Sequence, residues 1–149
     1  MKYQLILSLF STLFFSSQFG MANEDKEEAR PEVRLTAAKK TLLEKTQISL
    51  IYVKGLVCPS CAIGIRKNLS KMKGVDKKRF KDGIDMNPET QLVTIALKDG
   101  AELDNKDLIE RVVDAGYFAV EEYKLHENHL DAHQCKQDAT IEVVHHTHK

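Results

Sequence analysis

The chain has no net charge and no long apolar run, and it contains only three cysteines and three prolines. Its 149 residues hold 22 basic and 22 acidic side chains. This balance gives no electrostatic argument for a nucleic-acid partner, because binding to the phosphate backbone depends on excess positive charge. The longest apolar stretch, residues 5–15, is shorter than the roughly 20 residues that a membrane-spanning helix needs. The composition therefore argues against nucleic-acid-binding and integral membrane proteins.

The first 22 residues are typical of a secretory signal peptide. Lys2 precedes the apolar stretch, and Gly20-Met21-Ala22 provides a small-x-small cleavage pattern. We therefore expect cleavage after Ala22, a periplasmic or otherwise exported location, and no stable membrane insertion of the mature chain. An uncleaved anchor is the alternative. Exported compartments are oxidising, so a thiol pair there must be bound to metal, kept reduced or cycled as a disulfide.

The rest of the chain divides by composition into three parts. Residues 23–46 are rich in charge and short of large apolar side chains, which predicts a flexible arm with at most a short amphipathic helix after Pro31. Residues 47–124 combine strand-like and helix-like patterns and predict one compact domain. Residues 125–149 form a tail that holds all six histidines and the third cysteine.

The order of elements in residues 47–124 predicts the fold class. The predicted strands cover residues 48–53, 83–86, 92–97 and 117–120. Apolar residues at helical spacing predict one helix beginning at Ala62 and another beginning after Asp104. The resulting β-α-β-β-α-β order predicts an α+β, ferredoxin-like fold, in which a four-stranded antiparallel sheet carries two helices on one face.

The most informative motif, Gly55-Leu56-Val57-Cys58-Pro59-Ser60-Cys61, joins the first strand to the first helix. Unpaired N–H groups and the positive end of the helix dipole favour thiolate at such a turn. A thiolate pair there either binds a soft metal or exchanges disulfides. A purely structural disulfide is a third interpretation, but a C-x-x-C loop closes too few residues to stabilise a fold much.

This pattern resembles the heavy-metal-associated domain, a module of copper chaperones, metal-pumping ATPases and mercury-resistance systems. The resemblance is carried by residues 55–62, by Gly74-Val75 and by Asp114-Ala115-Gly116-Tyr117. With its signal peptide, the chain is most similar to the exported mercury-binding members of that family. The resemblance implies that Cys58 and Cys61 are the metal ligands. It also implies that Leu56 replaces a methionine packed beneath the loop, and that Tyr117 lies beside the loop and shields it.

The resemblance further implies a non-enzymatic protein that captures a thiophilic ion and passes it to a membrane metal transporter or another thiol protein. Sulfur ligands select Cu(I) or Hg(II) over hard cations, and Zn(II), which prefers four ligands, fits less well. Two features depart from the family pattern. The segment between Val75 and Leu92 is longer than is typical, which predicts a bulged second strand or an extra turn before it. The histidine-bearing tail lies outside the pattern.

A thiol-disulfide oxidoreductase is the alternative function, because Cys58-Pro59-Ser60-Cys61 also resembles the active site of periplasmic enzymes of that class. Cys58 would then be the nucleophile, and Cys61 would resolve the mixed disulfide. That fold needs a cis-proline opposite the cysteines and a later helix that covers the sheet. Pro88 is the only downstream proline, and Asn87-Pro88-Glu89-Thr90 predicts a hairpin turn instead.

The tail allows two interpretations. His126, His129 and His133 share one face if residues 125–137 are helical, so with Cys135 they are candidates for an ancillary copper or zinc site. A short disordered end with scattered histidines, which include His145, His146 and His148, is the other interpretation.

A run of basic residues follows the cysteine loop. It comprises Lys67, Lys71, Lys73, Lys77, Lys78 and Arg79. Such runs are most often solvated helix faces and turns, and docking of an acidic partner is the alternative interpretation.

Overall fold

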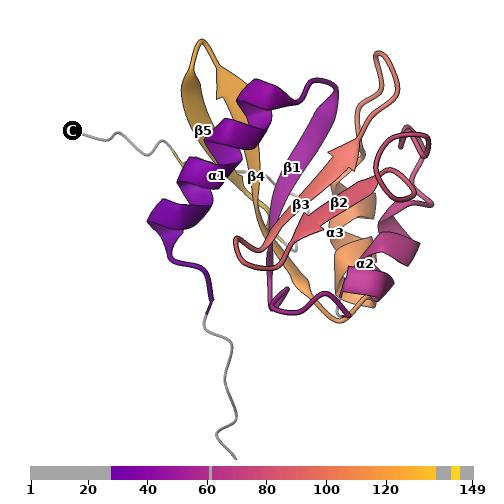
Figure 1. Cartoon of the computed structure of the whole chain (residues 1–149). Coiled ribbons are helices and arrows are strands. Elements are labelled where there is room, and N and C mark those ends of the chain that lie inside the picture. Colours follow the sequence, from indigo (N-terminus) through magenta and orange to yellow (C-terminus); the bar gives the residue numbers. More distant parts are fainter. Residues whose placement is uncertain (1–27, 61, 137–141, 145–149) are drawn as a thin grey trace, which may run out of the picture.

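The computed structural model describes residues 28–60, 62–136 and 142–144, so the predicted signal peptide lies outside the described residues. Four strands, β1 (Ile48–Lys54), β2 (Ile84–Asn87), β3 (Leu92–Ala96) and β4 (Phe118–His126), pair antiparallel in the order β2-β3-β1-β4. Two helices, α2 (Ala62–Leu69) and α3 (Asn105–Asp114), lie together on one face of this sheet (Figure 1). The predicted ferredoxin-like β-α-β-β-α-β fold is confirmed. None of the helices among the described residues is long and apolar enough to span a membrane.

The sheet continues beyond the predicted fourth strand. β5 (His129–Gln134) pairs with β4, and β6 (Glu142–Val144) pairs with β5, which extends the sheet to six strands. The turn between β4 and β5 uses Glu127 and Asn128, both with positive φ, as the tight turns of hairpins require. The helical interpretation of residues 125–137, on which a shared face of the histidines depended, is therefore wrong. Without β5, the backbone N–H and C=O groups along the outer edge of β4 would remain unpaired.

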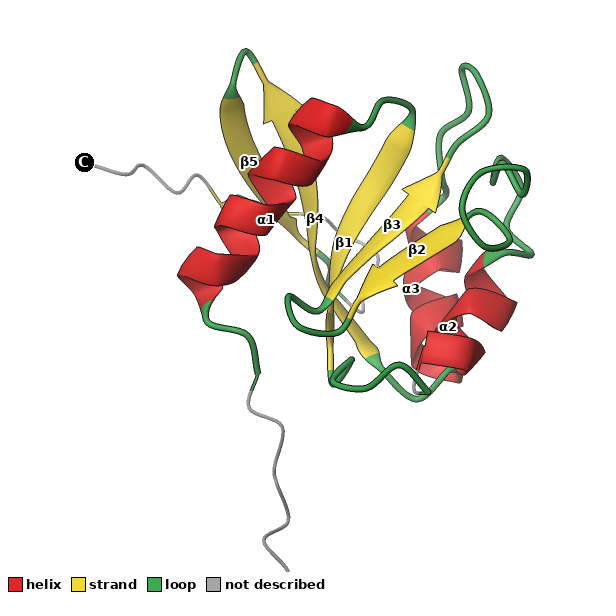
Figure 2. Cartoon of the chain, in the orientation of Figure 1, coloured by secondary structure: helices red, strands yellow, loops and turns green. Residues whose placement is uncertain are grey.

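The first described helix, α1 (Pro31–Glu44), covers the face of the sheet opposite α2 and α3 (Figure 2). The short helix predicted after Pro31 is confirmed, but the expectation of a flexible arm is wrong for the residues of α1. Residues 23–27 of that arm lie outside the described residues. Ala38 is fully buried, and Leu35 and Leu42 pack at the edge of the same cluster. The sheet contributes the other buried members of that cluster, which are Leu50, Tyr52, Leu92, Tyr123 and Ala132.

A buried arginine holds α1 against the sheet. Arg34 is 7% exposed, and its guanidinium carbon lies 3.6 Å from the centroid of the Tyr52 ring. Its Nε donates a hydrogen bond to the Tyr123 hydroxyl at 3.2 Å, and its Nη1 donates to the backbone oxygen of Ala29 at 2.9 Å. The Tyr123 hydroxyl in turn donates to the carboxylate of Glu121. A buried guanidinium is tolerated here because two of its nitrogens donate hydrogen bonds and its charge lies over the face of an aromatic ring.

Both faces of the central strands are therefore covered, which explains their burial. All five residues of β3 and the five central residues of β1 are buried. The larger core cluster lies between the sheet and the pair α2 and α3, and it includes Ile51, Val53, Leu56, Ile65 and Leu69. The loop that follows β1 thus starts from a strand that is covered on both faces.

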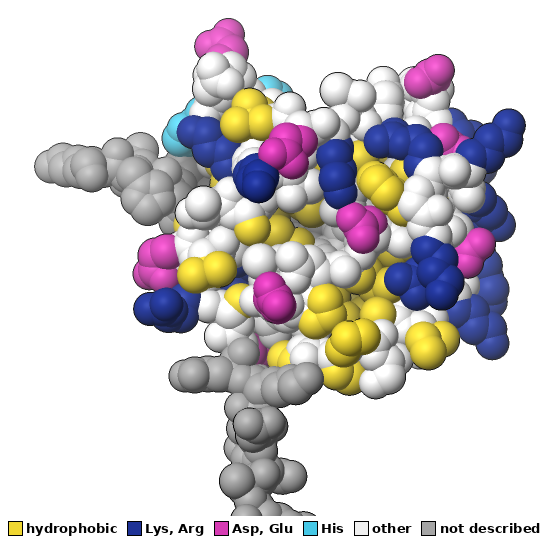
Figure 3. All heavy atoms as spheres, viewed as in Figure 1, with side chains coloured by type: hydrophobic (Ala, Val, Ile, Leu, Met, Phe, Trp, Pro, Cys, Tyr) yellow, Lys and Arg dark blue, Asp and Glu magenta, His cyan; other side chains and the backbone are white. Residues whose placement is uncertain are grey.

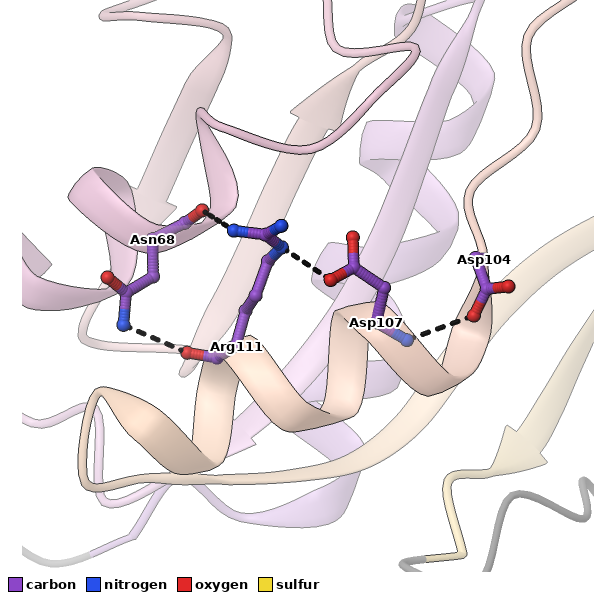
Figure 4. A network of polar contacts seen from close by, with 4 residues as sticks. All are labelled: Asn68, Asp104, Asp107 and Arg111. Atoms are coloured by element: carbon purple, nitrogen blue, oxygen red, sulfur yellow. Dashed lines mark hydrogen bonds and ion pairs between the residues drawn. The ribbon is translucent and has the colours of Figure 1, made fainter.

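α2 has only eight residues and is fastened to α3 by reciprocal hydrogen bonds (Figure 4). The Asn68 side-chain amide donates to the Arg111 backbone oxygen at 3.2 Å, and Arg111 Nη1 donates to the Asn68 backbone oxygen at 3.3 Å. Arg111 Nε also lies 2.7 Å from the carboxylate of Asp107, one turn earlier on α3. Asp104 caps α3, since its carboxylate accepts a bond from the Asp107 backbone N–H. These bonds fix the orientation of the helix that begins beside the cysteine motif.

The long segment between α2 and β2 contains the extra turns that its length predicted. It is tied to the sheet edge by bonds from the Asp76 N–H to the Ala96 oxygen and from the Ala96 N–H to the Gly83 oxygen. Gly83 has a φ of +84°, and a Cβ atom there would lie 2.4 Å from Cγ1 of Val75. Only glycine therefore fits at the point where this segment turns into β2.

Candidate metal centre

The cysteine motif lies in the loop between β1 and α2, as the sequence predicted (Figure 1). Gly55 begins the loop with a φ of +85°, and backbone bonds from the Leu56 N–H to Val53 and from the Ile63 N–H to Ser60 hold its two ends. α2 has no acidic side chain in its first turn. The positive end of the helix dipole therefore faces the loop without a neutralising carboxylate on α2 itself, which favours an anionic sulfur nearby.

Cys58 occupies a half-buried position in this loop. Its sulfur lies 3.3 Å from the hydroxyl of Ser60, and it is disulfide-bonded in the structure. Cys61, the second predicted ligand, lies outside the described residues. Metal ions bind thiolates, so a disulfide at Cys58 must be reduced before this sulfur can act as a ligand.

Two other predicted residues support the loop from below and from the side. Leu56 is fully buried in the core cluster between the sheet and the helices, so its side chain packs beneath the loop. The half-buried ring of Tyr117 lies against the start of the loop: a Cβ atom added to Gly55 would stand 3.5 Å from Cδ1 of Tyr117. Shielding of a bound ion by Tyr117 remains a prediction.

Exposed apolar side chains flank the loop, and the sequence analysis did not single them out. Ile63 is 64% exposed and Phe118 is 53% exposed. Ile63 follows directly on the first residue of α2, and Phe118 begins β4 next to Tyr117. Figure 3 shows hydrophobic side chains gathered at the lower end of the molecule, where the β1–α2 loop lies. The sequence did contain a signal for this exposed position. Ile63 lies outside the helical spacing of the buried residues Ala62, Ile65 and Leu69.

The three histidines proposed for an ancillary site lie on strands β4 and β5 instead of on one helix. His126 and His129 are exposed cross-strand partners beside the hairpin turn, and His129 lies 3.5 Å from the carboxylate of Asp131. His133 lies opposite Glu122. His129 and His133 are four positions apart, about 13 Å along a strand, which is too far for both to bind one ion. Among the described residues, no group of three or more histidine, cysteine or acidic side chains is arranged to hold a metal.

Cys135, the fourth candidate of that set, is a free thiol that packs against the larger core cluster. Its N–H donates to the Val120 oxygen at 2.8 Å, which extends the ladder of β4 and β5 by one residue. Burial, with a smaller contribution from Glu122 and Glu121, raises the pKa of the Cys135 thiol to about 12. The thiol is therefore protonated at neutral pH and is a poor metal ligand.

We expect Cys135 to react with a thiol-alkylating reagent at pH 8 at least about a hundredfold more slowly in the folded chain than in denaturant. The measurement uses the Cys58→Ser/Cys61→Ser variant, in which Cys135 is the only thiol.

Because the thiol pKa is higher in the folded than in the unfolded chain, this group lowers stability as pH rises from about 9 towards 12. A Cys135→Ala substitution should reduce this loss of stability at high pH. In the alkylation experiment, a folded chain that reacts as fast as the denatured chain would contradict the burial of the thiol.

Comparison with known families places the cysteine loop in context. The sequence model of the heavy-metal-associated domain matches residues 50–118, from the centre of β1 to the first residue of β4. Comparison with curated proteins and with solved structures gives no match. Domains of this family are typically non-catalytic and bind soft heavy metals. Residues 50–118 of the chain are therefore similar to the heavy-metal-associated domain, and the match names no particular member of that family.

Proposed function

We propose that this protein is an exported carrier of a soft metal ion, Cu(I) or Hg(II). Cys58 and Cys61 bind the ion after reduction, and a membrane metal transporter or another thiol protein receives it. The observation that carries the proposal is the position of Cys58 on a half-exposed loop at the start of a helix, within the residues that match the heavy-metal-associated domain. Export rests on the pattern of residues 1–22.

A carrier needs a site that holds the ion firmly and still releases it to a partner. Two sulfurs satisfy a soft ion with linear or bent coordination, and they leave room for an entering thiol of the partner. The exposed side chains of Ile63 and Phe118 supply apolar surface beside the loop, which a partner can cover while the ion moves between sulfurs. Ligand exchange of this kind requires no change in the oxidation state of the ion.

The disulfide at Cys58 is the observation that favours the second candidate, a thiol-disulfide oxidoreductase. Two features of the fold weigh against it. Pro88 lies in the β2–β3 turn, where the Asn87 side chain accepts bonds from the N–H groups of Glu89 and Thr90. The elements that follow α3 are strands, and none of the described residues after it forms a helix that covers the sheet.

Metal binding should depend on reduction of the protein. Chain reduced and handled without oxygen is expected to bind one equivalent of Cu(I) or Hg(II), whereas untreated chain binds far less, because a disulfide offers no thiolate. The measurement is the metal bound per chain after gel filtration, in parallel with a count of free thiols. A Cys135→Ser variant serves as the matched control and should bind the same amount as the parent chain.

Two results would contradict the proposal. One is equal metal binding by the reduced and untreated chain. The other is reduction of insulin disulfides at a rate comparable to that of a dedicated oxidoreductase, which would favour the second candidate.

A further inference from the structure

Positive charge is concentrated in the segment between the middle of α2 and the turn before β2. Eight of the 22 basic side chains lie in residues 66–81, and Asp76 is the only acidic residue among them. The rest of the chain is left with 14 basic and 21 acidic side chains. The neutral total thus conceals a strongly basic segment on a protein that is otherwise acidic.

The lysines of this segment are available for an external partner. All six are exposed, and none forms an ion pair with another described residue. They are Lys67, Lys71, Lys73, Lys77, Lys78 and Lys81. Figure 3 shows Lys and Arg side chains along the right-hand edge of the molecule, where α2 and the segment that follows it lie in Figure 1.

An aromatic side chain lies among these lysines. Phe80 is 38% exposed, and Lys78, Arg79 and Lys81 surround it in sequence. Its backbone has a φ of +52°, a left-handed conformation that side chains other than those of Gly, Asn and Asp rarely adopt. The ring belongs to neither core cluster, and it contacts cationic side chains instead, among them Arg79, whose guanidinium carbon lies 5.4 Å from the ring centroid.

The neighbouring residues hold this turn in place. Arg79 donates from Nη1 to the Gln47 oxygen and from Nη2 to the Thr46 oxygen, both at 3.0 Å, and the Gly83 N–H donates to the Arg79 oxygen at 2.9 Å. The Lys45 ammonium lies 4.7 Å from the centroid of the Phe80 ring. The turn is therefore a fixed surface, and binding by it does not require ordering of a flexible loop.

The basic turn at residues 77–81 and the cysteine loop lie at opposite ends of β1. Thr46 and Gln47, which bind Arg79, directly precede the strand, and the cysteine loop follows its last residue, Lys54. Seven strand residues span about 20 Å. A partner on this turn thus leaves the cysteine loop free.

We propose that the basic turn, residues 77–81 with Lys67, Lys71 and Lys73, binds the surface of a membrane that contains anionic phospholipid. The lysines bind headgroup phosphates, and the Phe80 ring enters the interfacial region of the bilayer. The cysteine loop then faces the aqueous phase. The inference is independent of which ion the loop carries.

The surface fits a lipid headgroup layer better than an acidic protein. Lysine ammonium groups on long side chains make point-charge contacts without fixed geometry, which suits a mobile layer of phosphates. An exposed aromatic ring adds the second contribution that stable attachment of a peripheral protein needs, because aromatic side chains favour the interface between headgroups and acyl chains. An acidic protein would satisfy the lysines but would not by itself account for the exposed ring.

The test measures co-sedimentation with vesicles of phosphatidylcholine, with and without phosphatidylglycerol. It uses the form that begins at Asn23, which retains every described helix and strand and lacks the apolar N-terminal stretch. We expect binding only to vesicles with phosphatidylglycerol, and weaker binding as salt is added. Lys77→Glu/Lys78→Glu should lower the partition coefficient by roughly tenfold or more. Asparagine suits the left-handed backbone at position 80, so Phe80→Asn should keep the fold. This variant should still bind the anionic vesicles at low salt, and added salt should abolish its binding completely.

Lys39→Glu/Lys40→Glu on α1 is the matched control, because it makes the same change of charge at two exposed positions on the opposite face of the sheet. It should bind as well as the parent form, and circular dichroism should show that all variants remain folded. Equal binding to both kinds of vesicle, or equal loss in both double variants, would overturn the proposal. It would also be overturned if the parent form bound polyglutamate but not the anionic vesicles, which would assign the surface to an acidic protein. Because no metal is used, failure here leaves the proposed metal-binding function untouched.

Discussion

Replacement of both Cys58 and Cys61 by serine is expected to abolish stoichiometric binding of Cu(I) or Hg(II) by the reduced chain. Serine hydroxyls are hard, weakly acidic ligands, so the variant offers the soft ion no thiolate at the loop. We expect the affinity to fall by at least roughly a thousandfold, which corresponds to about 4 kcal/mol. Competition with a chromophoric Cu(I) chelator measures the change under anaerobic conditions.

The single variants and Cys135→Ser complete this experiment. Each single substitution leaves one thiolate and should also lose most of the affinity, whereas Cys135→Ser should retain it because that thiol is half-buried and protonated. Thermal unfolding in the presence of reductant checks that the serine variants remain folded. If the double variant still bound one equivalent with the affinity of the parent chain, the site would have to lie elsewhere, and the histidines of the C-terminal tail would be the next residues to replace.

Replacement of Arg34 by alanine is expected to lower the free energy of unfolding by about 3 kcal/mol. The substitution removes two hydrogen bonds from a buried guanidinium and its contact with the face of the Tyr52 ring. It also leaves the buried Tyr123 hydroxyl without its donor beneath α1. Urea unfolding under reducing conditions measures the change, with the disulfide state equal in all samples.

Arg30→Ala provides the matched control, because Arg30 is an exposed arginine that directly precedes the same helix. We expect its effect to stay within roughly 0.5 kcal/mol, as is usual for surface positions. Similar stability of the Arg34→Ala and parent chains would show that α1 is not fastened to the sheet by this residue. The pH dependence supplies a second check. Burial and the hydrogen bond to Glu121 raise the pKa of Tyr123, so stability should fall as pH rises above the ordinary tyrosine pKa near 10.

The position of α1 shows why the flexible arm was predicted. The helix buries only Arg34 and Ala38 against the sheet, and its large apolar residues Leu35 and Leu42 pack at the edge of the cluster, so the apolar stripe is weak. The strands contained the missing signal. Residues 48–53 and 92–97 are almost continuously apolar, whereas a strand with one exposed face alternates apolar and polar residues. Such runs require a second covering element, and α1 provides it.

The hairpin of β4 and β5 was missed for a related reason. His126, His129 and His133 fit a helical spacing, but Leu130 and Ala132 alternate as a strand does, and both pack into the cluster beneath α1. Short segments that satisfy both periodicities are decided by the surroundings. Here the open edge of β4 and the apolar face beneath α1 favoured a strand, which separated the histidines along the sheet.

The sequence by itself determined the β-α-β-β-α-β order and the position of the cysteine motif between the first strand and the first of its helices. These features follow from local periodicity and turn residues, which act over a few neighbouring positions. Only the tertiary structure decided that α1 covers the second face, that the sheet has six strands, and that Phe80 lies exposed among lysines at the opposite end of β1 from Cys58. Each depends on contacts between residues far apart in the chain, such as Arg34 with Tyr123 and Arg79 with Gln47, which no local pattern encodes.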